Sequence, residues 1–269
     1  MTRLCRLFGV TRPGYYAWRG RPTSAHARQD RVLLEEMRAV FERSGGTYGS
    51  PRLYQALTTR GHRLSHRRVE RLMRAGGWRA RVARVYRRTT GTHQWFAQHP
   101  NRIRKRETTA PDQIWVGDLT YISVAGQWWY LAAVLDQHSR RLLAWRLGLT
   151  RDALFTRGVL DAAVRRRQPG PGLIFHSDRG SEFLGAPFHA RLVECGAQQS
   201  MTRGGAPDEN AHMESFFHSL KAELIHGRSF AAVGDLRQQL RQYVQYYNYQ
   251  RLHSSLGYRS PVDYERGAA

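Results

Sequence analysis

The hydrophobic pattern of the chain changes near residue 110, and this change most constrains the fold. Before it, apolar residues recur at helical spacing; after Pro111 they gather in short runs rich in β-branched, aromatic and aliphatic side chains, as is typical of strands. The strand-like runs cover residues 114–122, 128–135, 142–147 and 173–176, and helical stretches cover 152–167 and 187–194. Three strands followed by alternating helix and strand predict an α/β domain with a mixed sheet. Gly126 and Gln127 are the expected hairpin connection.

Three helices are expected before residue 77. The apolar spacing predicts one helix over 28–43, a second from Pro51 to about Gly61, and a third that follows the N-cap residue Ser65 and runs to about residue 76. A helix, a glycine-containing turn and a basic helix form a helix-turn-helix pattern, although a basic helix is also common as an ordinary solvated face. The candidate DNA-binding arginines lie mostly outside the apolar face of the third helix: Arg67, Arg68, Arg71 and Arg74.

The charge of the chain is strongly asymmetric. Its 43 Lys and Arg against 21 Asp and Glu give a formal net charge of +22, which favours a polyanionic partner, above all nucleic acid. Residues 1–110 carry 25 basic and 6 acidic side chains, so nearly all of the excess lies there. An arginine-biased genome would raise the charge everywhere and does not explain the balanced second part. We therefore expect the first part to bind phosphates and the second to hold functional carboxylates.

The composition argues against a membrane protein and a disulfide framework. The longest apolar run, 128–135, is too short to span a bilayer, and the first residues lack the features of a signal peptide, so a cytoplasmic location is expected. Cys5 and Cys195 have no Cys or His neighbours at metal-ligand spacing and are expected to be reduced thiols. Residues 77–110, which are rich in Arg, Thr, Gln and His, are expected to form a basic linker.

Three carboxylates occupy positions where the predicted elements can bring them together. Asp118 lies inside the first strand, Asp178 directly follows the fourth, and Glu214 opens a helical run after the loop 203–210. Strand ends and packed helices are rigid supports, so the three side chains are expected at one edge of the sheet. Three neighbouring carboxylates raise one another's pKa unless a divalent cation neutralises them. The arrangement therefore predicts Mg²⁺ or Mn²⁺.

The sequence motifs around these three carboxylates are distinctive. They are Trp115-Val116-Gly117-Asp118-Leu119-Thr120-Tyr121, His176-Ser177-Asp178-Arg179-Gly180 and Asn210-Ala211-His212-Met213-Glu214-Ser215-Phe216-Phe217. With 35 residues between Asp178 and Glu214, the chain closely resembles the second-frame (OrfB-type) transposase of bacterial insertion sequences, which has a retroviral-integrase-like core. The resemblance covers nearly the whole chain. The chain departs from the family pattern at Asp208 and Glu209, and at Glu182, which replaces the commoner amide and is expected to be peripheral.

The resemblance implies a fold and a chemistry. The expected organisation is an all-α helix-turn-helix region over 1–76, the linker over 77–110, a ribonuclease-H-like catalytic core over 111–225 and a C-terminal helical extension over 226–269. The implied reaction is two-metal phosphoryl transfer, in which Asp118 bridges two Mg²⁺ ions and Asp178 and Glu214 each complete one. The implied partners are double-stranded DNA at the element ends and the target, further copies of the chain, and an upstream-frame partner or fusion. No membrane partner is expected, and the implied location is the bacterial nucleoid.

Lys221 is a candidate DNA contact near the carboxylates. Lys105 and Lys221 are the only lysines in the chain, and Lys221 follows Glu214 by seven residues, which is about two helical turns and the same helix face. A chance lysine on a surface helix remains the alternative.

Other notable side chains are expected to be structural. Asp136 is expected to bond a turn, and Trp128 and Trp129 are expected to serve as core and sheet surface rather than as base-stacking platforms. Two further groups are expected to pack or to lie at the surface instead of forming a metal site or a cofactor box: His176, His212 and His218, and Tyr243, Tyr246 and Tyr247.

Two functional alternatives remain open at the level of sequence. A DNA-binding regulator or inactive transposase remnant would use the basic N-terminal part with a decayed core, although the complete carboxylate set argues against decay. A nuclease without joining activity would keep the fold and the carboxylates. Detection of DNA strand joining would separate a transposase from both.

Overall fold

The structure is a computed structural model that describes residues 2–20, 22, 24–81, 100–104, 106–203 and 207–267. It divides the chain into two compact units, Met1–Ala80 and Arg81–Ala269. Most of the expected linker 77–110 falls on residues 82–99, which lie outside the described residues. Within the described part, no helix is long and apolar enough to cross a membrane.

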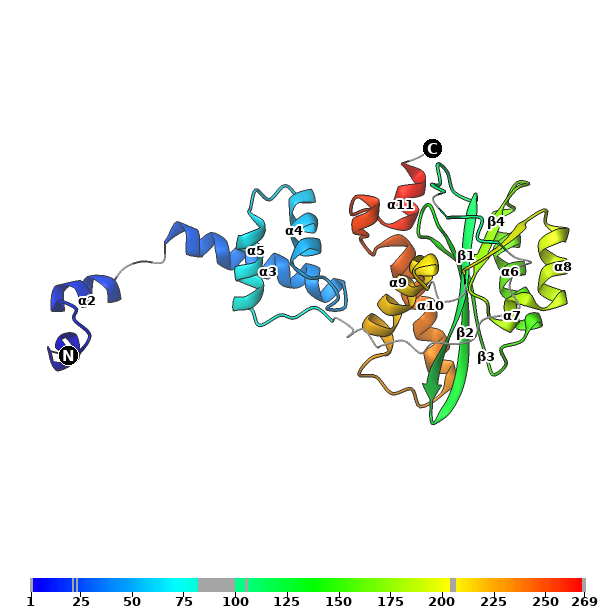
Figure 1. Ribbon diagram of the computed structural model, residues 1–269. Helices are drawn as coiled ribbons and strands as arrows, with labels where there is room; N and C mark the ends of the chain where they lie inside the picture. The colour runs from blue at the N-terminus through cyan, green and yellow to red at the C-terminus, as the bar shows by residue number, and fades with distance from the viewer. Residues whose placement is uncertain are drawn as a thin grey trace. The chain divides into compact units, whose positions relative to one another are not determined.

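The N-terminal unit is entirely helical, as expected (Figure 1). Its helices are α1 (Thr2–Leu7), α2 (Arg12–Arg19), α3 (Ala25–Arg43), α4 (Ser50–Thr59) and α5 (His66–Ala75). The side-chain oxygen of Ser65 accepts a hydrogen bond from the backbone N–H of Arg68 at 3.2 Å, which confirms Ser65 as the N-cap of α5. Ser24 caps α3 in the same way, so that helix begins three residues earlier than the apolar spacing predicts.

Helices α3, α4 and α5 bury a common apolar centre. Its fully or nearly fully buried members are Leu33, Met37, Val40, Leu53, Leu57, Val69, Leu72 and Met73. Helices α1 and α2 were not expected individually, because six and eight residues are too few to establish a helical repeat.

The second unit is built on a five-stranded mixed sheet, which confirms the predicted fold class. The strands are β1 (Ile114–Val124), β2 (Gln127–Asp136), β3 (Leu142–Gly148), β4 (Ile174–Ser177) and β5 (Gln198–Met201), in the order β3-β2-β1-β4-β5. The first three pair antiparallel, whereas β4 pairs parallel with β1 and with β5. Strand β5 was missed because its sequence, Gln-Gln-Ser-Met, has no strand-like apolar run.

The β1–β2 hairpin turns one residue earlier than expected. Ala125 and Gly126 both have positive φ, at 47° and 81°, which is the backbone conformation of tight two-residue hairpin turns. Gln127, expected in the turn, instead pairs with Val124 in the ladder.

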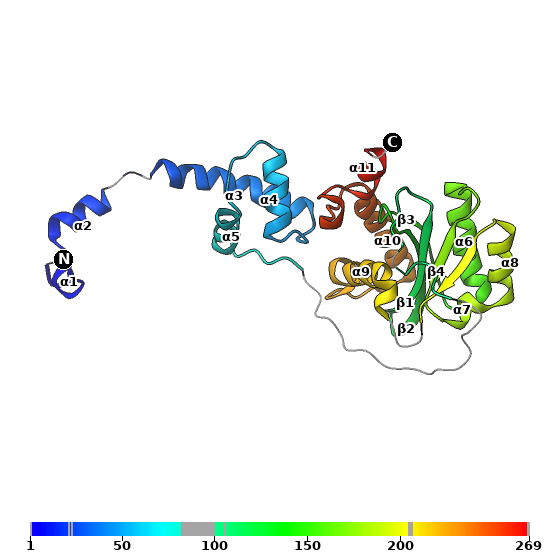
Figure 2. The ribbon, with the colours of Figure 1, turned by 45° about the horizontal axis from the view of Figure 1, so that its top comes forward.

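Helices cover both faces of the sheet, as Figure 1 shows with the sheet seen nearly edge-on and Figure 2 shows after rotation. One face packs against α6 (Ala153–Arg167), α7 (Ser181–Leu184) and α8 (Ala186–Glu194), and the other against α9 (Ala211–Leu220), the π-helical turn η2 (Lys221–Ile225) and α10 (Val233–Tyr249). Strand alternation supplies both sides, since Val116 belongs to the α9–α10 side and Trp115 to the other.

Helix α10 is part of the core. Its residues Leu236, Leu240, Tyr243 and Tyr247 are buried in the same cluster as the sheet, which confirms a packing role for these tyrosines. Tyr246 is partly buried against that cluster. Beyond α10 the chain forms the short helices η3 (Ser254–Leu256) and α11 (Pro261–Arg266).

A buried ion pair holds the end of α10 to η2. The Arg251 Nη2 atom lies 2.8 Å from the Glu223 Oε1 atom, and both side chains are more than nine-tenths buried. The Tyr243 hydroxyl donates a further hydrogen bond to Glu223 at 3.0 Å. Such a pair stabilises the native packing only while both charges are present.

Candidate active site

Parallel pairing of β1 and β4 brings two aspartates to one level of the sheet. Gly117 on β1 is in register with Ser177, the last residue of β4. The next residue on each strand is an aspartate, Asp118 and Asp178. Because neighbouring strands lie about 4.8 Å apart, the two carboxyl groups are neighbours, as the sequence predicts.

Local backbone hydrogen bonds orient both aspartates. The N–H of Leu119 donates to Asp118 Oδ1 at 2.7 Å, and the N–H of Gly180 donates to Asp178 Oδ1 at 3.1 Å. In each case the remaining carboxylate oxygen keeps its lone pairs for another partner.

Close packing beneath the aspartates requires glycine at position 117. A Cβ atom there would lie 2.5 Å from Phe175 Cζ, inside any acceptable contact distance. The Gly117 carbonyl also accepts a 3.4 Å hydrogen bond from Asn210 Nδ2, which ties the start of α9 to β1. Sequence reasoning noted Asn210 only as part of a motif, and its position just before a helix is the signal for a positioning role.

The carboxyl groups perturb one another electrostatically. Burial and then repulsion from Asp178 raise the pKa of Asp118 well above its ordinary value, and the charges of Glu182 and Glu214 raise it further. Burial is also the main cause of the raised pKa of Asp178, and Glu182 adds to it. Neighbouring acidic groups with raised pKa values in a partly buried site are typical of functional centres.

Glu214 lies near this pair without closing a complete cation site. It is exposed in the first turn of α9, and its charge acts on Asp118. Among the described residues, no three Asp, Glu, His or Cys side chains gather closely enough to share one metal ion. The donor set nevertheless suits a divalent cation, because hard carboxylate oxygens are its preferred ligands and a cation would relieve the repulsion.

Glu182 is not peripheral, which corrects the expectation from the sequence. Its side chain is nine-tenths buried at the start of α7, and its charge raises the pKa of both Asp118 and Asp178. Its carboxylate packs against Gly180, where an added Cβ would lie 2.7 Å from the Glu182 Cδ atom. The sequence showed an extra acid but not the short helix that turns it inward.

Lys221 lies at the start of η2 and faces the site. Burial lowers the pKa of its amine, and the charge of Asp118 acts in the opposite direction. Its Nζ atom is 5.4 Å from the centroid of the Tyr121 ring, on β1. A half-buried ammonium group held beside carboxylates is a suitable contact for a phosphate.

Asp136 has the structural role expected of it. Its side chain is fully buried, and Oδ1 accepts hydrogen bonds from the Ser139 N–H at 2.8 Å and the Ser139 hydroxyl at 2.9 Å. Its Oδ2 atom accepts from the N–H of Asp112 at 2.7 Å, which fixes the chain entering β1. Trp129 is partly buried against the core and Trp128 is exposed, which reverses the order expected from the sequence. The reason is the hairpin register, which pairs Trp129 with the buried Ile122 and Trp128 with Ser123.

The three histidines near the motifs occupy different surroundings. His176 is fully buried on β4, and its Nδ1 atom lies 2.9 Å from the Ser200 hydroxyl. His212 contacts Arg140, and His218 is exposed. Burial lowers the pKa of His176 to about 4, so it is neutral at neutral pH.

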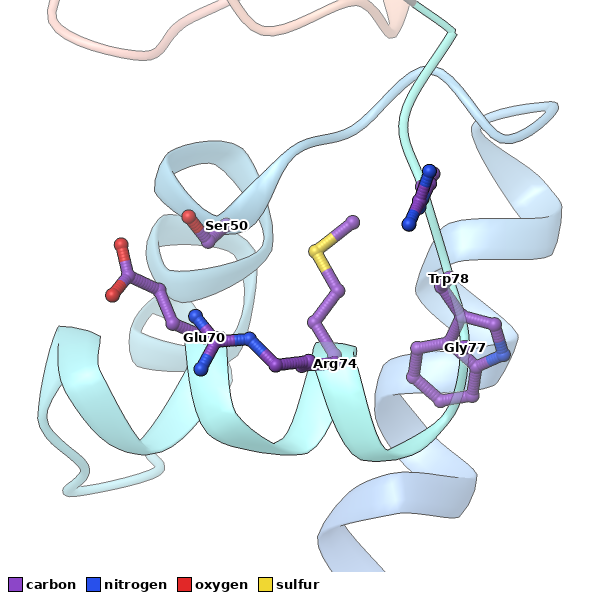
Figure 3. Close-up of a pocket in the computed structure, with 7 residues that line it drawn as sticks. Ser50, Glu70, Arg74, Gly77 and Trp78 are labelled. Carbon is purple, nitrogen blue, oxygen red and sulfur yellow. The ribbon is translucent and has the colours of Figure 1, made fainter.

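The four arginines on α5 fall into two pairs. Arg68 and Arg71 both bind Asp30 on α3, with Arg68 Nε 2.8 Å and Arg71 Nη2 2.5 Å from its carboxylate oxygens. Arg67 and Arg74 are exposed. Arg74 lines a surface pocket of about 590 Å³ together with residues of α4, α5 and the following segment (Figure 3).

Both units match known protein families. Residues 108–207 match the integrase core domain, residues 195–261 match a second integrase core domain model, and residues 27–86 match the HTH-like domain. The chain is 34% identical over 248 residues to the transposase for insertion sequence element IS904 of Lactococcus lactis subsp. lactis, covering 91% of this chain and 98% of that protein. It is 33% identical over 270 residues to transposase InsF for insertion sequence IS3A of Escherichia coli, covering 97% and 92%. Among solved structures, the HTLV-2 integrase catalytic core is 15% identical, with a TM-score of 0.43 over 58% of this chain and 97% of that chain.

The mixed sheet places two partly buried aspartates side by side, and the matches to the integrase core and the HTH-like domain imply a DNA-binding polynucleotidyl transferase. The chain belongs to the family of insertion-sequence transposases.

Proposed function

We propose that this transposase cleaves DNA at the ends of its insertion sequence and joins them to target DNA through Asp118, Asp178 and Glu214. The observation that carries the proposal is the pairing of Asp118 with Asp178 on adjacent parallel strands. Two neighbouring, partly buried carboxylates repel one another at neutral pH, and a bound cation would offset that repulsion. Residues 111–225 hold the chemistry in this proposal, and 226–269 extend it.

The proposed cofactor is a pair of Mg²⁺ ions, with Mn²⁺ as the alternative. Asp118 would contact both ions, and Asp178 and Glu214 would each contact one. When bound, such ions supply electrostatic stabilisation of the attacking and leaving oxygens in an in-line displacement at phosphorus. The carboxylates hold and orient this charge, and Asn210 keeps α9, which carries Glu214, against β1.

Cleavage and joining are the same displacement performed twice. Water is first the nucleophile, and its attack breaks the phosphodiester to free a 3′-hydroxyl at the element end. That hydroxyl then attacks a target phosphodiester, forming one P–O bond and breaking another, so no covalent enzyme intermediate is required. Lys221 binds a phosphate beside Asp118 in both steps, and its half-buried position keeps the amine in place.

DNA recognition is proposed to lie in residues 1–76, joined to the core by residues 77–110. Arg67 and Arg74 are the exposed phosphate contacts of α5, while Arg68 and Arg71 hold α5 against α3 through Asp30 and reach DNA from that fixed position.

Assembly is proposed to involve several copies of the chain. Each chain offers one carboxylate pair among its described residues, whereas joining brings together two element ends and a target. An upstream-frame partner or fusion is the proposed cover for the exposed apolar side chains of α1 and the segment after it, Leu4, Leu7, Phe8 and Val10.

The test is outward-facing PCR on a plasmid that carries the gene with its native flanks. Wild type is expected to give joined element ends, and Glu214→Gln none, because the amide removes one negative ligand while DNA binding stays intact. Asp235→Asn, an exposed acid of α10, is the control for loss of one charge and should behave as wild type. Joined ends from Glu214→Gln would refute the site. Cutting without joining would indicate a nuclease, and binding without cutting a regulator.

A further inference from the structure

Two large aromatic side chains are exposed on the β1–β2 hairpin. Tyr121 is 58% and Trp128 56% exposed. Trp128 is in register with Ser123, so Tyr121 is its diagonal neighbour on the same face of the sheet. The ring centroids are 5.0 Å apart and the planes meet at 90°, so the two rings form an open right-angled corner.

Lys221 relates this aromatic corner to the proposed catalytic carboxylates. Tyr121 and Asp118 are three residues apart on β1, so their side chains leave opposite faces of the strand. Lys221 contacts the aromatic corner, because its Nζ atom lies 5.4 Å from the Tyr121 ring centroid. The charge of Asp118 in turn acts on Lys221. A half-buried cation is therefore within reach of both the exposed rings and Asp118.

We propose that Trp128, held by Tyr121, stacks an unpaired DNA base next to the phosphodiester that is cut or joined. Every base has a flat face, so stacking on an aromatic ring needs no particular sequence, and the adjoining phosphate meets Lys221. An apolar protein segment would gain nothing from that cation, which is why a nucleotide is the better occupant. The inference rests on the proposed catalytic site, and it assigns Trp128 and Tyr121 as positioning residues for the strand end.

The experiment is photo-crosslinking of the full chain to DNA that carries 5-iododeoxyuridine. One duplex ends in an unpaired three-nucleotide tail containing the probe, and a matched duplex holds the probe in a base pair. We expect the tailed duplex to crosslink to the peptide that contains Trp128 or Tyr121, and the paired duplex to crosslink there much less. Crosslinks that map elsewhere, or that are equal for both duplexes, would overturn the proposal.

Binding of the two duplexes by variants gives the second measurement. Trp128→Ala should weaken binding of the tailed duplex by roughly tenfold and leave the paired duplex unchanged, whereas Trp128→Phe keeps a ring and most of the affinity. Tyr249→Leu, which truncates an exposed ring on α10, is the matched control and should bind as wild type. Equal binding by Trp128→Ala, or a loss of self-association instead of tail binding, would contradict a base-stacking role.

Failure of the catalytic assignment gives a different result. Crosslinking requires no cleavage, so it should persist in Glu214→Gln. Joined ends from Glu214→Gln, together with crosslinks at Trp128, would refute the carboxylate assignment and support the aromatic corner. If joining of the element ends depends on Glu214 but no crosslinks map to the hairpin, the carboxylate assignment would be supported and the aromatic corner refuted.

Discussion

At the scale of single residues, Asp118 and Asp178 are partly buried and receive few polar contacts. Asp118 and Asp178 each accept one short backbone hydrogen bond, while burial and their neighbours oppose ionisation. A carboxyl group in this position binds a cation only after losing its proton. The affinity of the site for metal must therefore rise with pH through the raised pKa values of the pair.

Glu182 allows this dependence to be tested. Replacing Glu182 by Gln removes a charge that raises the pKa of Asp118 and Asp178, so both should ionise at lower pH. We expect the rise of Mg²⁺ affinity with pH, measured by isothermal titration calorimetry, to move to lower pH in Glu182→Gln. Glu194→Gln, at the end of α8, provides the control. An unchanged profile would show that Glu182 does not act on the pair.

His176 predicts a pH dependence of stability. Its pKa is about 4 in the fold and about 6.5 in an unfolded chain, so only the unfolded state gains a proton between these values. The contribution of neutral His176 is complete above pH 6.5 and is lost as the pH falls towards 4, by at most about 3 kcal/mol. Urea unfolding of wild type and His176→Asn at pH 7 and pH 5 measures the difference. Parallel losses in both proteins would contradict the prediction.

The motifs indicated the candidate catalytic carboxylates more directly than the residues around them. Asp118, Asp178 and Glu214 could be chosen because each stands in a recognisable word at a defined interval. The orientation of Glu182 could not, because it depends on α7, a helix of four residues that has no periodic signal. Neither the exposure of Trp128 nor its right-angled contact with Tyr121 could be predicted, because both depend on a hairpin register set by Ala125 and Gly126.

At the scale of elements, N-cap residues and long apolar repeats predicted the helices. The residues typical of turns did not fully predict where the turns lie. Ser65 and Asp152 each accept the capping hydrogen bond that begins a helix. The hairpin position was wrong by one residue because an alanine with positive φ takes a place usually reserved for glycine or asparagine. Strand β5 is held by its parallel pairing with β4, a long-range contact that its own sequence does not show.

The exposed arginines of helix α5 allow the proposed DNA contacts to be tested. Arg67→Gln and Arg74→Gln should each weaken DNA binding and lower the slope of log affinity against log salt by about one. Arg68→Gln should in addition destabilise the N-terminal unit, because its guanidinium binds Asp30. Fluorescence anisotropy across a salt series gives the slopes. The control, Arg241→Gln, removes an exposed charge of α10. If it weakens DNA binding as much as the α5 variants do, α5 is not part of the DNA interface.

At the scale of the whole molecule, positive charge and acidic side chains are concentrated in different parts of the chain. Residues 1–110 carry most of the positive charge, while the second unit keeps enough acids to build a buried site. This division was visible in composition alone. The sequence does not show that α10 completes the core of the second unit. The apolar face of α10 predicts burial, but it does not predict which surface the helix covers.

The buried pair between Arg251 and Glu223 should therefore be important for the stability of the second unit. Arg251→Met leaves a buried carboxylate without its guanidinium and should lower the free energy of unfolding by about 3–5 kcal/mol. Arg241→Met, at an exposed position of α10, should change it by less than about 0.5 kcal/mol. Urea unfolding followed by circular dichroism makes the comparison, and equal stabilities would show that the pair is dispensable.

The late position of α10 also matters during synthesis. A nascent chain gains α3, α4 and α5 early, but the buried cluster beneath β1 stays open until the ribosome has added Leu236 to Tyr247. A gene interrupted by a stop codon between these points still encodes the basic helices and no closed core. We expect such fragments to occupy the ends of the element without cutting them, so a decayed copy would silence its intact relatives in the same cell.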